Sequence, residues 1–182
     1  MKKILSSLAL GIAFATTQAA SLNWTVTAVY EAGTDTLATG YSVYLFITEQ
    51  SSDFGAKTTT VSDIEDLISS KSDISEYVAA SAETTNGRVP SATGYNGNAF
   101  AAGDSLSGFA VIFDARDYAS AEHYIVTSEK SASWTSGTGA KSLGFGGITA
   151  SKDASAWTSV PEPATAALAL LGLGMLVKRR KA

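Results

Sequence analysis

The run Phe109-Ala110-Val111-Ile112-Phe113 is the most apolar stretch in the body of this 182-residue chain, and it decides the fold class. Its aromatic and β-branched residues are typical of strands. Since the run is apolar on both faces, we predict a central strand over residues 107–114 that is covered on both sides. Residues 41–48 have the same character and predict a second central strand.

Further strand signals lie on either side of this run. Leu22, Trp24 and Val26 begin an alternation of apolar and polar residues that extends to residue 30, which indicates a half-buried strand. Other strands are predicted over residues 77–85, 123–128, 143–149 and 156–160. The pair Asn86-Gly87 predicts a type I′ hairpin turn. Residues 91–103 and 133–139, rich in small and polar residues, are expected to be loops.

One short helix interrupts the strands. Ser62 and Glu65 have the spacing of a capping box, which predicts a helix from Asp63 to Ser70 with Ser62 as its N-cap. Residues 73–76 could add a further turn. Many short strands, polar turns and one small helix predict a mainly β fold, a β-sandwich or jelly-roll-like body. An α+β fold with a helix on one sheet is the alternative.

The N-terminal residues have the composition of a secretory signal peptide. Lys2 and Lys3 form a basic start, residues 4–15 are apolar, and small residues follow at positions 17 and 19. We predict that residues 1–20 are a signal peptide, with cleavage by signal peptidase at Ala19 or Ala20. An uncleaved N-terminal anchor helix is the alternative.

The last residues of the chain, 160–182, join three parts of different chemistry. In order, they are the rigid acidic turn Pro161-Glu162-Pro163, the uncharged run 164–177, and the basic residues Lys178-Arg179-Arg180-Lys181. The uncharged run predicts a membrane helix, with a buried core helix as the alternative, although it is shorter than the about 20 residues that usually span a bilayer. Snorkelling basic side chains and local thinning of the bilayer would compensate. The basic residues are expected to stay cytoplasmic and to leave the body outside.

This tail, from Val160 to Ala182, resembles the PEP-CTERM sorting signal of Gram-negative bacteria. In that family a Pro-Glu-Pro motif precedes a transmembrane helix and an Arg-rich tail, and an exosortase-type membrane protease is thought to cut the segment. The resemblance implies that Pro161, Glu162, Pro163 and the basic residues Lys178, Arg179, Arg180 and Lys181 are sorting residues. It also implies an exosortase and, transiently, the inner membrane as partners. The same tail family carries the label of an ice-binding protein C-terminal segment.

The body upstream, residues 21–160, is predicted to be a single extracytoplasmic domain. Residues 41–46, residues 109–114 and Trp157 resemble a small β-domain that recurs before such tails. Six of the 13 basic residues and one of the 17 acidic residues lie in the terminal segments, so the net charge of the body is −9. Such a surface repels nucleic acid, which we exclude as a partner. Cysteine is absent, which excludes disulfides, zinc fingers and thiol chemistry.

A hydrolase motif is present in fragments. Gly103-Asp104-Ser105-Leu106 spells the motif of the GDSL hydrolases, whose serine is the nucleophile and whose base comes from a late Asp-x-x-His. The single histidine, His123, has Ser120 rather than Asp three residues before it. A serine without a positioned base is inert. We therefore predict no catalytic residue and no enzyme. A small hydrolase at Ser105 is kept only as an alternative.

Other candidate sites are incomplete. Residues 137–142 lack two glycines of a phosphate-binding loop. The carboxylates that could in principle bind calcium, Asp63, Glu65, Asp66, Asp114 and Asp117, lack the spacing of a calcium loop, and we predict no metal and no cofactor. Trp24, Trp134 and Trp157 are candidates for a sugar-stacking platform, with Trp134 expected to be exposed. Thr58-Thr59-Thr60 is too isolated for the regular ladder that ice binding requires.

These observations predict a secreted, non-enzymatic protein of the cell envelope or extracellular matrix. It would be anchored in the inner membrane before processing, and then lie in the envelope, on the outer surface or outside the cell. A carbohydrate-binding module of the exopolysaccharide layer, using Trp134 and nearby loops, is the alternative.

Overall fold

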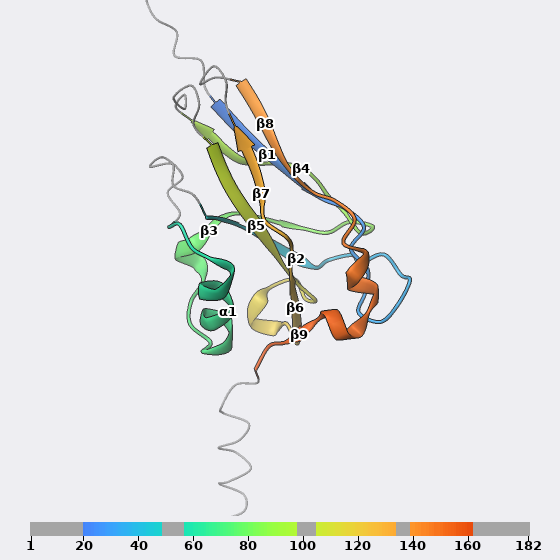
Figure 1. Ribbon diagram of the computed structural model, residues 1–182. Coiled ribbons are helices and arrows are strands. Elements are labelled where there is room, and N and C mark those ends of the chain that lie inside the picture. The colour runs from blue at the N-terminus through green and yellow to red at the C-terminus, as the bar shows by residue number, and fades with distance from the viewer. Residues whose placement is uncertain (1–19, 49–56, 98–104, 134–138, 162–182) are drawn as a thin grey trace, which may run out of the picture.

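The computed structural model describes residues 20–48, 57–97, 105–133 and 139–161, and Figure 1 shows the two sheets and the helix that these residues form. The predicted signal peptide up to Ala19, the helix 164–177 and the sorting residues from Glu162 onward lie outside the described residues. Within the described ranges, no helix has the length and apolar character needed to cross a membrane.

The strands form two sheets. The smaller sheet has the order β4-β1-β8, and comprises β4 (Val89–Gly97), β1 (Ala20–Val26) and β8 (Gly139–Phe145). The larger has the order β3-β2-β5-β6-β9, and comprises β3 (Val78–Glu83), β2 (Ser42–Ile47), β5 (Ser105–Phe113), β6 (His123–Val126) and β9 (Thr158–Ser159), with β7 (Lys130–Ser133) paired to the first part of β5. One α-helix, α1 (Val61–Ser69), and 3₁₀ turns at Ser75–Tyr77, Tyr118–Ser120, Thr149–Lys152 and Ala154–Ala156 complete the described structure.

The two central strands of the larger sheet, β2 and β5, are covered on both faces, as the sequence predicted. Alternate side chains of β5 point to opposite sides, so Ala110 and Ile112 face the smaller sheet while Phe109 and Val111 face α1. Every residue of β5 after Ser105 is buried. The apolar run 109–113 therefore contributes side chains to two hydrophobic cores, one on each face of the larger sheet.

The first core lies between the two sheets and makes the fold a sandwich. Its members from the smaller sheet are Leu22, Trp24, Val26, Val89, Leu143 and Phe145, and those from the larger sheet include Val43, Leu45, Ile47, Leu106, Ala110 and Ile112. Glycine is required at position 108 of β5, because a Cβ there would lie 2.5 Å from the carbonyl oxygen of Phe46 on β2.

The second core lies under α1. Ile64 and Ile68 are buried against Phe46, Phe109 and Phe113 on the larger sheet. The Phe46 and Phe109 rings are stacked, with centroids 5.3 Å apart. The helix thus covers an aromatic face, whereas the smaller sheet covers a mainly aliphatic one.

The start of α1 differs from the prediction. Thr60, not Ser62, is the N-cap: its hydroxyl accepts the backbone N–H of Asp63 at 3.2 Å, and Asp63 Oδ2 accepts the N–H of Thr60 at 3.1 Å. The helix consequently begins at Val61 rather than Asp63, and it ends at Ser69. Thr60 and Asp63 have the same three-residue spacing as Ser62 and Glu65, and the structure uses the earlier pair.

The turn at Asn86-Gly87 forms as predicted, with φ of 51° and 70°. It does not join neighbouring strands of one sheet, however, because β3 pairs with β2 while β4 pairs with β1. The chain crosses from one sheet to the other at this turn.

Other predictions were wrong in detail, and one strand was missed. Residues 91–97 are strand rather than loop, since they pair with β1, and β7 was missed. The first strand ends at Val26 instead of residue 30, because Ala28 adopts a positive φ of 58°. The strand predicted over residues 143–149 ends at Phe145, and the one predicted over residues 156–160 is only Thr158–Ser159; Thr149 and Ala156 lie in 3₁₀ turns instead.

Candidate functional site

The described chain ends at the edge of the larger sheet, beside β6. There β9 pairs antiparallel with β6, so that Thr158 lies opposite Tyr124 and Ser159 opposite His123 (Figure 1). The backbone N–H of Val160 donates to the carbonyl oxygen of Glu122 at 2.7 Å, and the Val160 side chain packs on the core under α1. Pro161, the next residue, is exposed.

The buried side chain of Trp157 anchors the chain directly before β9. The indole is only 7% exposed, its Nε1 donates to the Ser151 carbonyl at 2.8 Å, and Tyr41 meets it edge-on at 5.9 Å between ring centroids. Ser151 is itself fully buried, and its hydroxyl accepts the N–H of Tyr30 at 2.8 Å. The body therefore holds the chain firmly up to the residues that directly precede Pro161.

A cavity of about 460 Å³ adjoins this end of the chain. Its lining residues are Lys71, Ala119, Ser120, Ala121, Glu122, His123, Ser159, Val160 and Pro161. His123 is held in place by Asp114, whose Oδ2 lies 2.8 Å from Nδ1 of the ring and whose Oδ1 accepts the backbone N–H of His123 at 3.0 Å. The pair orders the loop that leads into β6, and hence the partner of β9.

The family description of the PEP-CTERM protein-sorting motif matches residues 159–181. The chain carries a PEP-CTERM sorting motif. The resemblance found in the sequence is thereby confirmed, and the PEP-CTERM motif marks a secreted protein that is sorted by an exosortase, a membrane protease. No curated protein and no solved structure matches the chain.

The PEP-CTERM match begins inside the folded body. Its first residue, Ser159, is the last residue of β9, and Val160 and Pro161 are the other described residues within it. Glu162, Pro163 and the basic residues Lys178 to Lys181 lie outside the described residues, so their roles in sorting stay predictions. The same is true of cleavage at Ala19 or Ala20.

The structure does not bring Ser105 and His123 together. Ser105 begins β5 opposite Ser133, whereas His123 contacts Asp114, directly beyond the other end of the same strand. Nine residues of strand correspond to about 30 Å. The Asp114–His123 pair therefore lies too far from Ser105 to act as its general base. The GDSL motif does not form a Ser-His-Asp triad in this fold.

Three of the five candidate calcium carboxylates, Asp63, Asp114 and Asp117, have partners within the protein. Asp63 caps α1; the Thr60 hydroxyl, and then its backbone N–H, lower the pKa of this carboxyl. Asp117 Oδ1 accepts the N–H of Ser120 at 2.9 Å, and Asp114 holds His123. Among the described residues, no group of three or more acidic or histidine side chains could hold a metal ion.

The predicted sugar platform does not form from the three tryptophans. Trp24 is fully buried in the sandwich and Trp157 is nearly so, while Trp134 lies outside the described residues. Residues 139–142 are part of β8 and pair with β1, so they do not form a phosphate loop. The threonine run is divided as well: Thr58 is exposed, Thr59 is buried and Thr60 caps the helix.

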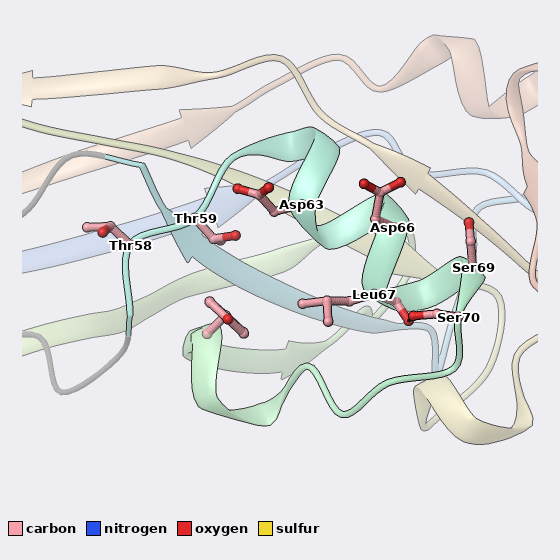
Figure 2. Close-up of a pocket in the computed structure, with 8 residues that line it drawn as sticks. Thr58, Thr59, Asp63, Asp66, Leu67, Ser69 and Ser70 are labelled. Atoms are coloured by element: carbon pink, nitrogen blue, oxygen red, sulfur yellow. The ribbon is translucent and has the colours of Figure 1, made fainter.

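A larger cavity lies beside α1, and no pattern in the sequence indicated it. Its volume is about 780 Å³, and its lining residues are Thr58, Thr59, Asp63, Asp66, Leu67, Ser69, Ser70 and Tyr77 (Figure 2). These residues come from three segments: the stretch before the helix, the helix and its C-terminal end, and the following 3₁₀ turn. No single motif contains them, and the only available signal was the polar face of the helix.

Proposed function

We propose that this chain is a secreted, non-enzymatic protein of the cell envelope or extracellular matrix, delivered as folded cargo by the PEP-CTERM route. The observation that supports this function best is the position of the motif. The match starts at Ser159, where the last strand of the body ends, so the chain divides into a β body and a sorting tail.

The proposed route has three steps. Signal peptidase removes the N-terminal segment at Ala19 or Ala20, residues 164–177 hold the exported chain in the inner membrane, and an exosortase then cuts the tail near Pro161-Glu162-Pro163. The body is released to the outer surface or to the exopolysaccharide layer. Its net charge of −9 supports release, because anionic lipid repels such a surface.

The junction has no free spacer on the body side. Val160 is still hydrogen-bonded to Glu122, and Pro161 is the next residue. Since one extended residue covers about 3.3 Å, an exosortase that reads Pro161 works within a few ångströms of the β6–β9 edge. The cavity lined by Lys71, Glu122 and Pro161 is then at the enzyme–substrate contact.

The test is made in the native host. A variant with Pro161→Ala, Glu162→Ala and Pro163→Ala is compared with the unaltered chain by fractionation and intact mass. We expect the variant to accumulate in the inner membrane with its tail, while the unaltered chain leaves the membrane without it. The matched control is Ser155→Ala, an exposed position in the body, which should be sorted normally. Normal sorting of the triple variant would refute the proposal.

A further inference from the structure

The cavity beside α1 contains a buried polar atom that has no partner. Thr59 is 5% exposed, and its hydroxyl oxygen, with less than 1 Å² accessible, makes no hydrogen bond within the described part of the chain. Leaving a buried hydroxyl unsatisfied is unfavourable, and a bound water or ligand is one way to complete it. Figure 2 shows this hydroxyl pointing from the segment before α1 toward the helix, across from the Leu67 side chain.

Two backbone hydrogen bonds anchor the segment that carries Thr59. Its N–H donates to the carbonyl oxygen of Ile47 at 2.9 Å, which ties the segment to the end of β2. On its other side, the N–H of Lys57 donates to the Glu76 carbonyl at 3.1 Å. The cavity wall is therefore anchored to the larger sheet and to the 3₁₀ turn, and α1 is anchored by its own capping box.

The lining is rich in hydroxyls and carboxylates. Thr58, Ser69, Ser70 and Asp66 are exposed polar groups around the rim, and Leu67 and the Tyr77 ring add apolar surface. A sugar matches this combination, because each ligand hydroxyl can both donate and accept while the C–H face contacts apolar groups. A volume of about 780 Å³ lies within the range of small-molecule sites.

The charges disfavour other ligands. An anion would meet Asp63 and Asp66, and Lys57, whose ammonium lies 5.4 Å from the centroid of the Tyr77 ring, is already paired with Glu76. A metal ion would find only two carboxylates among the described lining residues, one of which caps the helix. A neutral polyhydroxylated molecule meets neither obstacle.

We propose that this cavity binds a neutral carbohydrate, with Asp66 as an acceptor and the Thr59 hydroxyl completed by a sugar hydroxyl. This inference goes beyond the proposed sorting function, since the cavity is built from α1 and its flanking segments rather than from β9. Because the Thr59 hydroxyl oxygen exposes less than 1 Å², a neighbouring group has to move before a sugar can reach it. Because the cavity is open, we expect weak binding, with a Kd on the order of 1 mM for a monosaccharide or disaccharide.

The test uses saturation-transfer NMR on the full chain, in a detergent without a sugar headgroup. The probes are glucose, galactose, mannose, N-acetylglucosamine, maltose and cellobiose, with glucuronate as an anionic comparison. We expect at least one neutral sugar to bind and glucuronate to bind more weakly. Asp66→Ala should raise the Kd by about tenfold, since a hydrogen bond to a charged acceptor is lost. Glu83→Ala, an exposed carboxylate on β3, should leave it unchanged.

Thr59→Val separates a ligand-binding role from a structural one. Valine keeps the branched shape but removes the orphaned hydroxyl, so the free protein should melt at a higher temperature while sugar binding falls by several-fold. Ser42→Ala is the matched control, because Ser42 also has a buried, unpartnered hydroxyl but lies at the far end of β2. It should raise the melting temperature without changing binding. If no neutral sugar binds, or if Thr59→Val and Asp66→Ala bind as the unaltered chain does, the proposal is wrong.

Discussion

The two faces of the larger sheet are built differently. On one face, the smaller sheet closes a core of mainly aliphatic side chains whose members from β1, β2 and β5 are almost completely buried. On the other face, a nine-residue helix and short turns cover an aromatic core. Both cavities described above border this second face, and the chain leaves the body there at Val160.

This difference separates stability from function within one sheet. Alternate residues of a strand point to opposite faces of its sheet. The residues of β5 can therefore pack in the closed core between the sheets on one face and in the core under α1 on the other. The core between the sheets has more buried apolar members than the core under α1, so we expect it to supply the larger share of the folding free energy. The helix face borders both cavities, at which we propose contact with a protease and with a small molecule.

The largest expected effect comes from truncating one buried residue on each face. Leu45→Ala, in the sealed sandwich, should lower the free energy of unfolding by about 3–4 kcal/mol. Ile68→Ala, on α1, should lower it by about 2 kcal/mol, because the helix can move inward and partly fill the space. Urea unfolding measures both. Equal losses, or a larger loss for Ile68, would remove the distinction between the two faces.

A smaller effect is expected at the chain exit. Val160→Pro removes both the N–H that donates to Glu122 and the side chain that packs on the core under α1, and it should cost at least about 1 kcal/mol, with faster amide hydrogen exchange in β9. Pro161→Ala is the control, since this exposed residue has no backbone N–H to lose and should change stability by less than about 0.5 kcal/mol. If both variants exchange alike, β9 does not hold the tail.

The helix cap is tested by two neighbouring substitutions. Thr60→Ala removes the side-chain acceptor of the Asp63 N–H and should cost about 1 kcal/mol. Ser62→Ala, at the residue that the sequence pattern favoured, should be neutral because Ser62 is exposed within the first turn. The reverse ranking in thermal unfolding would restore the predicted cap.

The smallest effect concerns pH. Hydrogen bonds from Thr60 lower the pKa of Asp63 below its ordinary value of 3.8. A carboxyl with a lowered folded-state pKa stabilises the fold above the unfolded-state value and loses that contribution as the pH falls through the folded-state value. The difference in stability between the unaltered chain and Asp63→Asn should therefore be constant near neutral pH and shrink below about pH 3.8. A difference that grows on acidification would contradict this assignment.

Much of the strand content could be predicted from the sequence. The runs at residues 41–48 and 109–113 are apolar on both faces, and both became central strands. The pairing partners could not be predicted, because period two tells which face is buried but not what covers it. The parallel pairing of β1 with β8 joins segments about 120 residues apart, for which local sequence holds no signal.

The missed elements and sites have the same cause. In β7, Ala132 is the only buried residue, and its flanking serines and lysine give no strand pattern. Trp157 could be recognised in the sequence, but its burial depends on Ser151 and Tyr41. The cavity beside α1 forms only when three separate segments meet, whereas the sorting motif was found because its chemistry is contiguous.

The most direct test of the sorting account is the intact mass of the protein isolated from its native host, fraction by fraction. We predict that the surface or extracellular form begins near Ala20 or Ser21 and has lost the residues from about Pro161 onward, with a membrane form that still carries the tail. A single full-length species beginning at Met1 and recovered from the cytosol would contradict the account.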